Sequence, residues 1–153
     1  MNQDQSSSQP QKNESGFALG IDSQDPSAAA SGRSILSIED EQFIGELYGR
    51  ALTKAGYDVT IEHDGKKGLA LAQTDKYDII LLDLLLPSMH GSDVLRALRD
   101  PAQTPHLHSK IIITTNFEER QEVRQEIEKL ADAYLIKIDV TPNQLVEFLN
   151  HIK

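Results

Sequence analysis

Short aliphatic runs alternate with amphipathic stretches along the chain from residue 34 onwards. The run Ile79–Leu82 is aliphatic at every position, which is typical of a parallel strand covered on both faces. Four other segments have the composition or the alternation of strands. They are Ser34–Ile38, Tyr57–Glu62, Lys110–Thr115 and Ala133–Ile136. The pattern therefore predicts five strands.

Apolar residues at helical spacing follow each predicted strand. The first three helices are expected at residues 44–55, 64–74 and 91–100. Asn116, with Glu119 three positions later, resembles a capping box and predicts the start of a fourth, very polar helix. Thr141, Pro142 and Gln144 combine a cap, a first-turn proline and a second capping residue, and they predict the start of a fifth helix.

The alternation of strands and helices defines the expected fold. Five strand–helix pairs predict an α/β protein in which a parallel sheet carries helices on both faces. Because crossover connections are right-handed, the sheet is expected to be doubly wound. In such sheets the binding crevice lies at the carboxyl ends of the strands, so we look for functional residues there.

Residues 1–33 differ in composition from the rest of the chain. They are rich in Ser, Gln, Asn, Ala and Gly and contain few large apolar side chains. Such a segment buries too little surface to offset its ordering entropy, so we expect a disordered N-terminal arm. One domain is expected over residues 34–153, because a chain of 153 residues is long enough for one ordinary domain.

Charge and composition narrow the class of function. The formal net charge of −9 disfavours direct binding to nucleic acid. The chain has no cysteine, which excludes disulfides, thiolate nucleophiles and Cys-ligated zinc. No run approaches the roughly 18 apolar residues of a membrane span, and the N-terminus lacks the pattern of a secretory signal. We therefore expect a cytoplasmic protein without membrane contact.

Charged and hydroxyl side chains stand at the ends of four predicted strands. Glu39 and Asp40 follow the first strand, Asp83 follows the third, Thr115 ends the fourth and Lys137 follows the fifth. Carboxylates about 4 Å apart repel by about 4 kcal/mol at an effective dielectric near 20, so a cation is needed. Oxygen ligands favour Mg²⁺. A carboxylate placed between Mg²⁺ and an ammonium can attack a phosphoryl group.

Four motifs, in this order, resemble the receiver domain of bacterial two-component response regulators. They are Ile38-Glu39-Asp40, Asp78–Gly91, Ile111–Thr115 and Asp132–Lys137. Each motif is weak alone, but all four at these separations are specific. The resemblance covers about residues 34–153. It implies a stand-alone, single-domain receiver with a flavodoxin-like sheet of strand order 2-1-3-4-5 and five helices.

The resemblance also implies roles for individual residues. Asp83 is expected to accept phosphate from the phosphohistidine of a sensor histidine kinase or a phosphotransfer protein. A Mg²⁺ or Mn²⁺ ion would be held by Glu39, Asp40, Asp83 and the backbone carbonyl of Leu85. Thr115 is expected to be the switch hydroxyl, Lys137 to pair with the phosphoryl group, and Tyr134 to change rotamer on activation.

The chain departs from the family pattern at several positions around this site. Ile138 stands where the family usually has proline, and a trans peptide with a shifted loop is expected there. Asn116 replaces a small residue and is expected to crowd the access of a phosphodonor. Leu85 and Phe117 flank the expected phosphoryl position and are apolar, so neither can orient an attacking water. We therefore expect slow autodephosphorylation.

The resemblance also implies how the protein passes on its signal. A downstream protein, or a second copy in a homodimer, is expected to bind the face of the fourth helix, the fifth strand and the fifth helix. No output domain is recognisable, and the protein is expected to catalyse only its own phosphorylation and dephosphorylation.

Two alternative functions compete with this interpretation. They are a pseudo-receiver that binds proteins without phosphorylation and an aspartyl phosphatase of the haloacid dehalogenase type. The phosphatase needs an acid where this chain has Leu85.

Overall fold

The computed structural model describes residues 32–153. Within them, one five-stranded parallel sheet has the strand order β2-β1-β3-β4-β5. The strands are β1 (Ser34–Ile38), β2 (Asp58–Glu62), β3 (Ile79–Leu82), β4 (Lys110–Thr115) and β5 (Ala133–Ile136). The helices are α2 (Gln42–Lys54), α3 (Gly65–Ala72), α4 (Gly91–Arg99), α5 (Gln121–Leu130) and α6 (Pro142–Asn150), with a 3-10 turn η2 (Lys137–Asp139). The predicted α/β fold and its strand order are confirmed.

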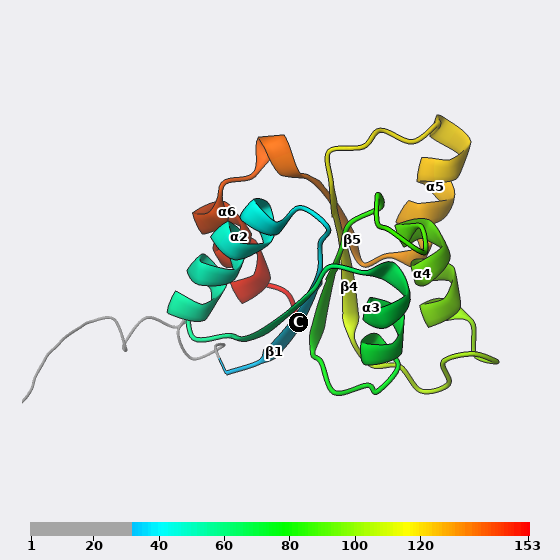
Figure 1. Cartoon of the computed structure of the whole chain (residues 1–153), viewed down its shortest axis with the longest axis horizontal. Helices are drawn as coiled ribbons and strands as arrows, with labels where there is room; N and C mark the ends of the chain where they lie inside the picture. The colour runs from blue at the N-terminus through cyan, green and yellow to red at the C-terminus, as the bar shows by residue number, and fades with distance from the viewer. Residues whose placement is uncertain (1–31) are drawn as a thin grey trace, which may run out of the picture.

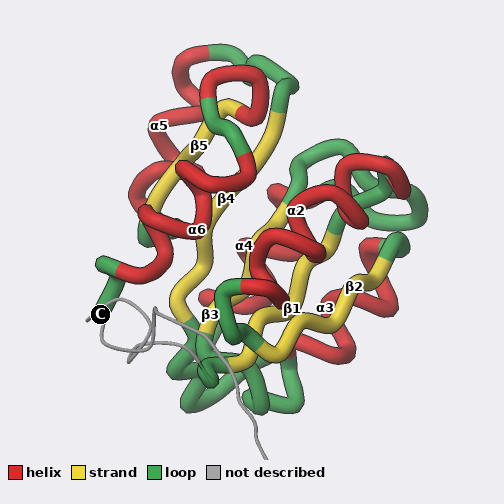
Figure 2. Tube along the Cα trace, turned by 90° about the vertical axis from the view of Figure 1, so that its left-hand side faces the viewer, coloured by secondary structure: helices red, strands yellow, loops and turns green. Residues whose placement is uncertain are grey.

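Helices cover both faces of the sheet. Figure 1 shows α2 and α6 on one face and α3, α4 and α5 on the other. In the turned view of Figure 2, the strands run between these two layers. Successive strand residues point to opposite faces: Ile80 and Ile111 belong to one buried core, and Ile79 and Ile112 belong to the other. The aliphatic runs are therefore explained by burial on both faces of the central strands.

Two element boundaries differ from the sequence prediction. β2 begins at Asp58, because the N–H of Tyr57 donates to the carbonyl oxygen of Leu52 in α2 at 3.1 Å and not to β1. The Tyr57 side chain packs in the core between the sheet and the layer of α2 and α6. There its hydroxyl donates to Asn150 Oδ1 at 2.6 Å. α5 begins at Gln121 and not directly after Asn116. The cause of this second shift lies in the functional site.

The first described residues, Gly32 and Arg33, lead directly into β1. The guanidinium of Arg33 donates to the carbonyl oxygens of Leu149 at 2.7 Å and Ile152 at 3.0 Å. These bonds tie the start of β1 to the end of α6, and Figure 1 places the C-terminus beside β1. The remainder of the predicted disordered arm, residues 1–31, lies outside the described residues. Among residues 32–153, no helix is long and apolar enough to cross a membrane.

Candidate functional site

The carboxyl ends of three strands bring a lysine and two carboxylates together. Lys137 follows β5, and its Nζ donates to Glu39 Oε1 at 2.5 Å and to Asp83 Oδ2 at 3.1 Å. Glu39 follows β1, and Asp83 follows β3. All three side chains are buried, so solvent screens these ion pairs only weakly. We call these three residues the acid–lysine cluster.

Burial and pairing act in opposite directions on the pKa values of the cluster. Burial raises the pKa of Glu39, while the hydrogen bond from Lys137 lowers it and the charge of Asp83 raises it. Burial lowers the pKa of Lys137, but its bond to Glu39 and the charges of both carboxylates outweigh burial and leave this pKa raised. The net rise in the pKa of Glu39 favours a protonated, neutral carboxyl, whereas the rise in the pKa of Lys137 favours a charged lysine with ionised partners. We assign a charged lysine, because two carboxylate oxygens face its Nζ.

A cavity of about 460 Å³ opens beside the acid–lysine cluster. It is lined by Asp40, Glu41, Asp83, Leu85, Thr115, Asn116, Phe117 and Lys137. Glu39 is not among the lining residues, because its carboxylate binds Lys137 and also accepts the N–H of Glu41 at 3.0 Å. The fold therefore gathers the rim residues at one place. It adds Glu41, whose only sequence signal is its position directly after Asp40.

Backbone contacts fix Asp83 at the end of the central strand. Its N–H donates to the carbonyl oxygen of Ile38 at 3.0 Å, which extends the β1–β3 ladder by one residue. A Cβ atom on Gly91 would collide with the Asp83 carbonyl oxygen, so only glycine fits at the start of α4. The N–H of Leu85 lies 3.4 Å from Asp83 Oδ1. One carboxylate oxygen of Asp83 thus faces Leu85, and the other faces Lys137.

The residues after β4 do not form the predicted helix cap. Thr115 is fully buried, and its Oγ1 accepts the N–H of Phe117 at 3.0 Å. Asn116 Oδ1 accepts the N–H of Ile138 at 2.9 Å, and α5 begins only after Arg120, whose side chain makes no cap hydrogen bond. The prediction of a capping box at Asn116 is therefore wrong. A backbone donor from the neighbouring connection takes the oxygen that the cap would have used.

The connection after β5 holds Lys137 in place. Its turn η2 is closed by a hydrogen bond from the N–H of Val140 to the Lys137 carbonyl oxygen at 3.1 Å. Tyr48 of α2 donates its hydroxyl to the carbonyl oxygen of Val140 at 2.8 Å. Thr141 and Gln144 form the predicted capping box at the start of α6, which is confirmed. Nothing in the sequence distinguishes Tyr48 from the other apolar residues of α2.

Tyr134 of β5 stands apart from the cavity. Its half-buried ring packs against the core beneath α3, α4 and α5, and the Arg124 guanidinium lies 4.3 Å from the ring centroid. Burial raises the pKa of Tyr134, while the charge of Arg124 opposes the rise. The hydroxyl is buried and has no hydrogen-bond partner among residues 32–153. A buried hydroxyl in this state is costly, so this position of the ring is not favoured by its polar group.

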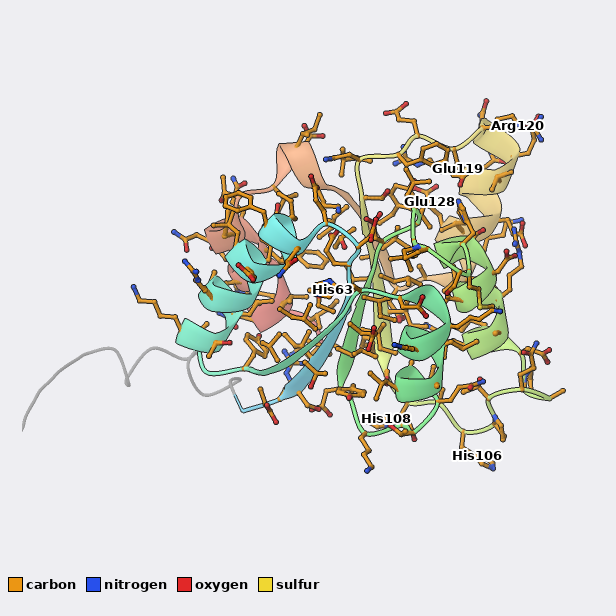
Figure 3. The ribbon with its side chains drawn as sticks, in the orientation of Figure 1. His63, His106, His108, Glu119, Arg120 and Glu128 are labelled. Carbon is orange, nitrogen blue, oxygen red and sulfur yellow. The ribbon has the colours of Figure 1, made fainter. Side chains whose placement is uncertain are left out.

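The cavity offers oxygen atoms as possible metal ligands. Asp40 and Asp83 both line it. The part of the chain that the structure describes has no group of three or more His, Cys, Asp or Glu side chains that could hold a metal. Mg²⁺ is commonly bound by one or two carboxylates together with waters and phosphate oxygens, so this donor set fits Mg²⁺. His106 and His108 lie at the opposite end of the sheet (Figure 3), where His108 binds Asp75.

A doubly wound parallel sheet with acids and a lysine at its carboxyl rim defines a receiver-type α/β domain. The family model described as response regulator receiver domain matches residues 35–150. The chain therefore belongs to the family of response regulator receiver domains, which act in two-component signalling.

Individual relatives agree with this assignment. Response regulator ArlR of Staphylococcus saprophyticus is 37% identical over 119 residues, which cover 78% of this chain and 50% of the relative. The chain thus spans about half the length of the curated relatives it matches. The chemotaxis response regulator CheY4 of Vibrio cholerae is 30% identical with a TM-score of 0.65, over 76% of this chain and 95% of that one. A structure from a streptococcal family of redox sensors, evolved from two-component response regulators, is 30% identical with a TM-score of 0.66, over 77% and 49%.

Proposed function

We propose that this protein is a phospho-receiver whose Asp83 accepts a phosphoryl group from the phosphohistidine of a sensor histidine kinase or a phosphotransfer protein. The observation that carries the proposal is the acid–lysine cluster, in which Lys137 Nζ contacts both Asp83 and Glu39 at the edge of a cavity. The fold alone is not sufficient, because a related fold serves the streptococcal redox sensors. The complete set of acids and lysine favours phosphoryl chemistry.

Phosphoryl transfer needs an oxygen nucleophile and positive charge around the transferred phosphoryl group. An oxygen of Asp83 attacks phosphorus and forms the new P–O bond, while the P–N bond to the donor imidazole breaks. The imidazole leaves with the bonding electron pair and takes up a proton. Lys137 neutralises charge on the phosphoryl oxygens, because its Nζ already contacts Asp83. Thr115 lines the same cavity and supplies a hydroxyl to the bound phosphoryl group.

A divalent cation is part of the proposal. Asp40, Asp83 and the backbone carbonyl of Leu85 would hold Mg²⁺ or Mn²⁺. Glu39, which the sequence also predicts as a ligand, binds Lys137 in this structure. When bound, the ion supplies further neutralisation of phosphoryl charge. Removal of divalent cations with a chelator should therefore abolish phosphorylation.

Incubation with acetyl phosphate and Mg²⁺, followed by mass spectrometry of the intact chain, tests the proposal. We expect a mass gain of one phosphoryl group in the wild type and none in Asp83→Asn. Asp93→Asn is the matched control, because Asp93 is an exposed carboxylate of α4 outside the cavity. A mass gain that persists in Asp83→Asn would contradict the assignment of the acceptor. No gain in the wild type would favour a protein-binding module that works without phosphorylation.

Signal output is proposed through the face formed by α5, β5 and α6. Tyr134 lies in β5, and its buried hydroxyl has no partner within residues 32–153, so little polar stabilisation opposes a change of rotamer. Loading with beryllofluoride and Mg²⁺ should shift the amide resonances of this face in the wild type but not in Asp83→Asn. A downstream protein or a second copy of the chain captured only by the loaded form would identify the partner. Unchanged resonances on this face would argue against it as the output surface.

A further inference from the structure

A hydrogen bond joins the two strand connections that flank the cavity. The side-chain oxygen of Asn116 accepts the backbone N–H of Ile138 at 2.9 Å. Asn116 directly follows Thr115, and Ile138 directly follows Lys137. The bond therefore links the residue after the proposed switch hydroxyl to the residue after the lysine of the cluster.

The N–H of Ile138 needs an acceptor from outside its own turn. It lies in η2, a single turn of 3-10 helix, and the first N–H groups of such a turn have no acceptor within it. Asn116 supplies that acceptor. A proline at position 138 would carry no N–H and would leave the oxygen of Asn116 without this donor. The residues at 116 and 138 therefore act as one donor–acceptor pair.

The backbone at Lys137 and Ile138 is restrained from two sides. The side chain of Ile138 is 80% exposed. On the α2 side, the hydroxyl of Tyr48 lies 3.4 Å from the carbonyl oxygen of Lys137 and 2.8 Å from that of Val140. Asn116 provides the restraint from the β4 side. Because the Lys137 side chain extends from this backbone to the two carboxylates, the position of its Nζ depends on both restraints.

We propose that Asn116 is a positioning residue for Lys137. By binding the N–H of Ile138, it holds the lysine backbone where Nζ reaches Asp83. The effect on phosphoryl transfer rests on the proposed function, whereas the restraint itself does not. This role differs from the crowding of donor access that the sequence predicts for Asn116. The two roles have opposite consequences when the side chain is removed.

Amide hydrogen exchange in the full, unphosphorylated chain tests the restraint by itself. Asn116→Ala should speed exchange of the Ile138 N–H about fivefold, as expected for the loss of one hydrogen bond of ordinary net strength. Asn116→Asp keeps an acceptor oxygen and should retain wild-type protection at Ile138. Equal exchange in the wild type and Asn116→Ala would overturn the proposal.

The rate of phosphorylation by acetyl phosphate tests the consequence for Lys137. Asn116→Ala should lower the maximal rate about fivefold while the half-saturating donor concentration stays unchanged. Asn116→Leu keeps the volume without the acceptor and should be slowed equally. Ile138→Ala keeps the N–H donor and serves as the matched control with the wild-type rate. A faster or unchanged rate in Asn116→Ala would overturn the positioning role, and a faster rate would support crowding.

The two assays separate the possible failures. If the wild type accepts no phosphoryl group, the proposed function fails, and exchange at Ile138 alone decides whether Asn116 restrains this backbone. Melting temperatures should change little, because the bond is exposed. A loss of rate in Asn116→Ala that is matched by a large fall in melting temperature would overturn positioning in favour of a general structural role.

Discussion

The two connections that leave the rim of the sheet beside the acid–lysine cluster are held to the fold in different ways. The connection from β5 to α6 is fixed along its length. Its turn η2 is closed by the N–H of Val140, and Tyr48 binds the carbonyl oxygen of the same residue. It ends in the capping box of Thr141 and Gln144. The backbone N–H groups of Thr141 and Gln144 at the start of α6 therefore both have hydrogen-bond acceptors within the capping box.

The connection from β4 to α5 has fewer such contacts. Its first residues are held by the bonds of Thr115 with Phe117 and of Asn116 with Ile138. The side chain of Arg120 makes no cap bond at the start of α5, and Ile127 is the only fully buried residue of that helix. Figure 3 shows Glu119 and Arg120 at the outer end of this region.

This difference separates the two tasks of a receiver site. Lys137, which contacts the proposed acceptor Asp83, lies on the well-fixed connection, so the lysine is already in position before any phosphoryl group would bind. The segment that follows Thr115 has few buried apolar contacts, and such segments open locally at low free-energy cost. We therefore expect the structural change that follows phosphorylation to begin in the connection from β4 to α5. Four variants, one of them a double substitution, test this comparison.

Removal of the lysine charge should have the largest effect. In Lys137→Met, two buried carboxylates lose the cation that they share, and breaking such a buried pair typically costs about 3–5 kcal/mol of unfolding free energy. Urea unfolding measures this loss. Lys129→Met removes an exposed lysine of α5 and should change stability little. A similar stability in both variants would show that the acid–lysine cluster does not fix the connection from β5 to α6.

The same variant should acquire a characteristic dependence on pH. The bond from Lys137 lowers the pKa of Glu39, so its removal lets burial raise that pKa further. A folded-state pKa above the unfolded value means that stability is present below the ordinary value of 4.5 and is lost as pH rises through the folded value. Lys137→Met should therefore lose stability relative to the wild type as pH increases above the ordinary value of 4.5. A constant difference over this range would contradict a coupling between the two side chains.

The second effect concerns the lifetime of the phosphorylated state. Leu85 and Phe117 line the cavity and are 50% and 37% exposed, so polar replacements can be accommodated without opening the core. Leu85→Asn combined with Phe117→Glu supplies groups that can orient water, and the decay of phosphorylated protein should become at least about tenfold faster. Leu85→Ala with Phe117→Ala opens the cavity without adding a polar group and is the control. An unchanged decay rate in the polar variant would refute the prediction of a lifetime set by these residues.

Loss of the α6 cap should weaken the fixed connection by a smaller amount. Thr141→Ala removes the side-chain oxygen that accepts the N–H of Gln144 at 3.1 Å. Such a loss typically costs about 1 kcal/mol of stability. Thr53→Ala, at an exposed position within α2, makes the same chemical change without touching a cap. If both variants unfold at the same urea concentration, the capping box is not what stabilises the start of α6.

The sequence predicted the fold well because burial on both faces leaves a strong local signal. Aliphatic runs such as Ile79–Leu82 indicate central parallel strands without reference to the rest of the chain. The neighbourhood of Asp40, Asp83 and Lys137 was also predictable, because the carboxyl ends of parallel strands meet at one rim. Which of these side chains bind one another is decided by the tertiary structure and was not predictable. Spacing alone does not tell that Lys137 binds Glu39 as well as Asp83.

The two predicted capping boxes show why some local signals fail. Thr141 caps α6 as predicted, because its own helix supplies the donor that its oxygen binds. Asn116 has a comparable pattern, but the N–H of Ile138 reaches it from another strand connection. Its side-chain oxygen is therefore used across the sheet rim and not along the chain. Such competition involves residues distant in sequence, and no short pattern contains it.

The smallest expected effect is a gain of stability at the start of α5. Arg120 occupies the cap position with extended backbone but makes no side-chain cap bond. Arg120→Ser would place an acceptor there, and we expect a gain of about 0.5–1 kcal/mol. Arg120→Ala removes the same charge without adding an acceptor, so the difference between the two variants isolates the cap. Amide exchange within α5 should slow in Arg120→Ser, because local opening there becomes more costly. If the two variants unfold alike, the missing cap is not the reason that this connection is held less firmly, and the small buried surface of α5 remains as the cause.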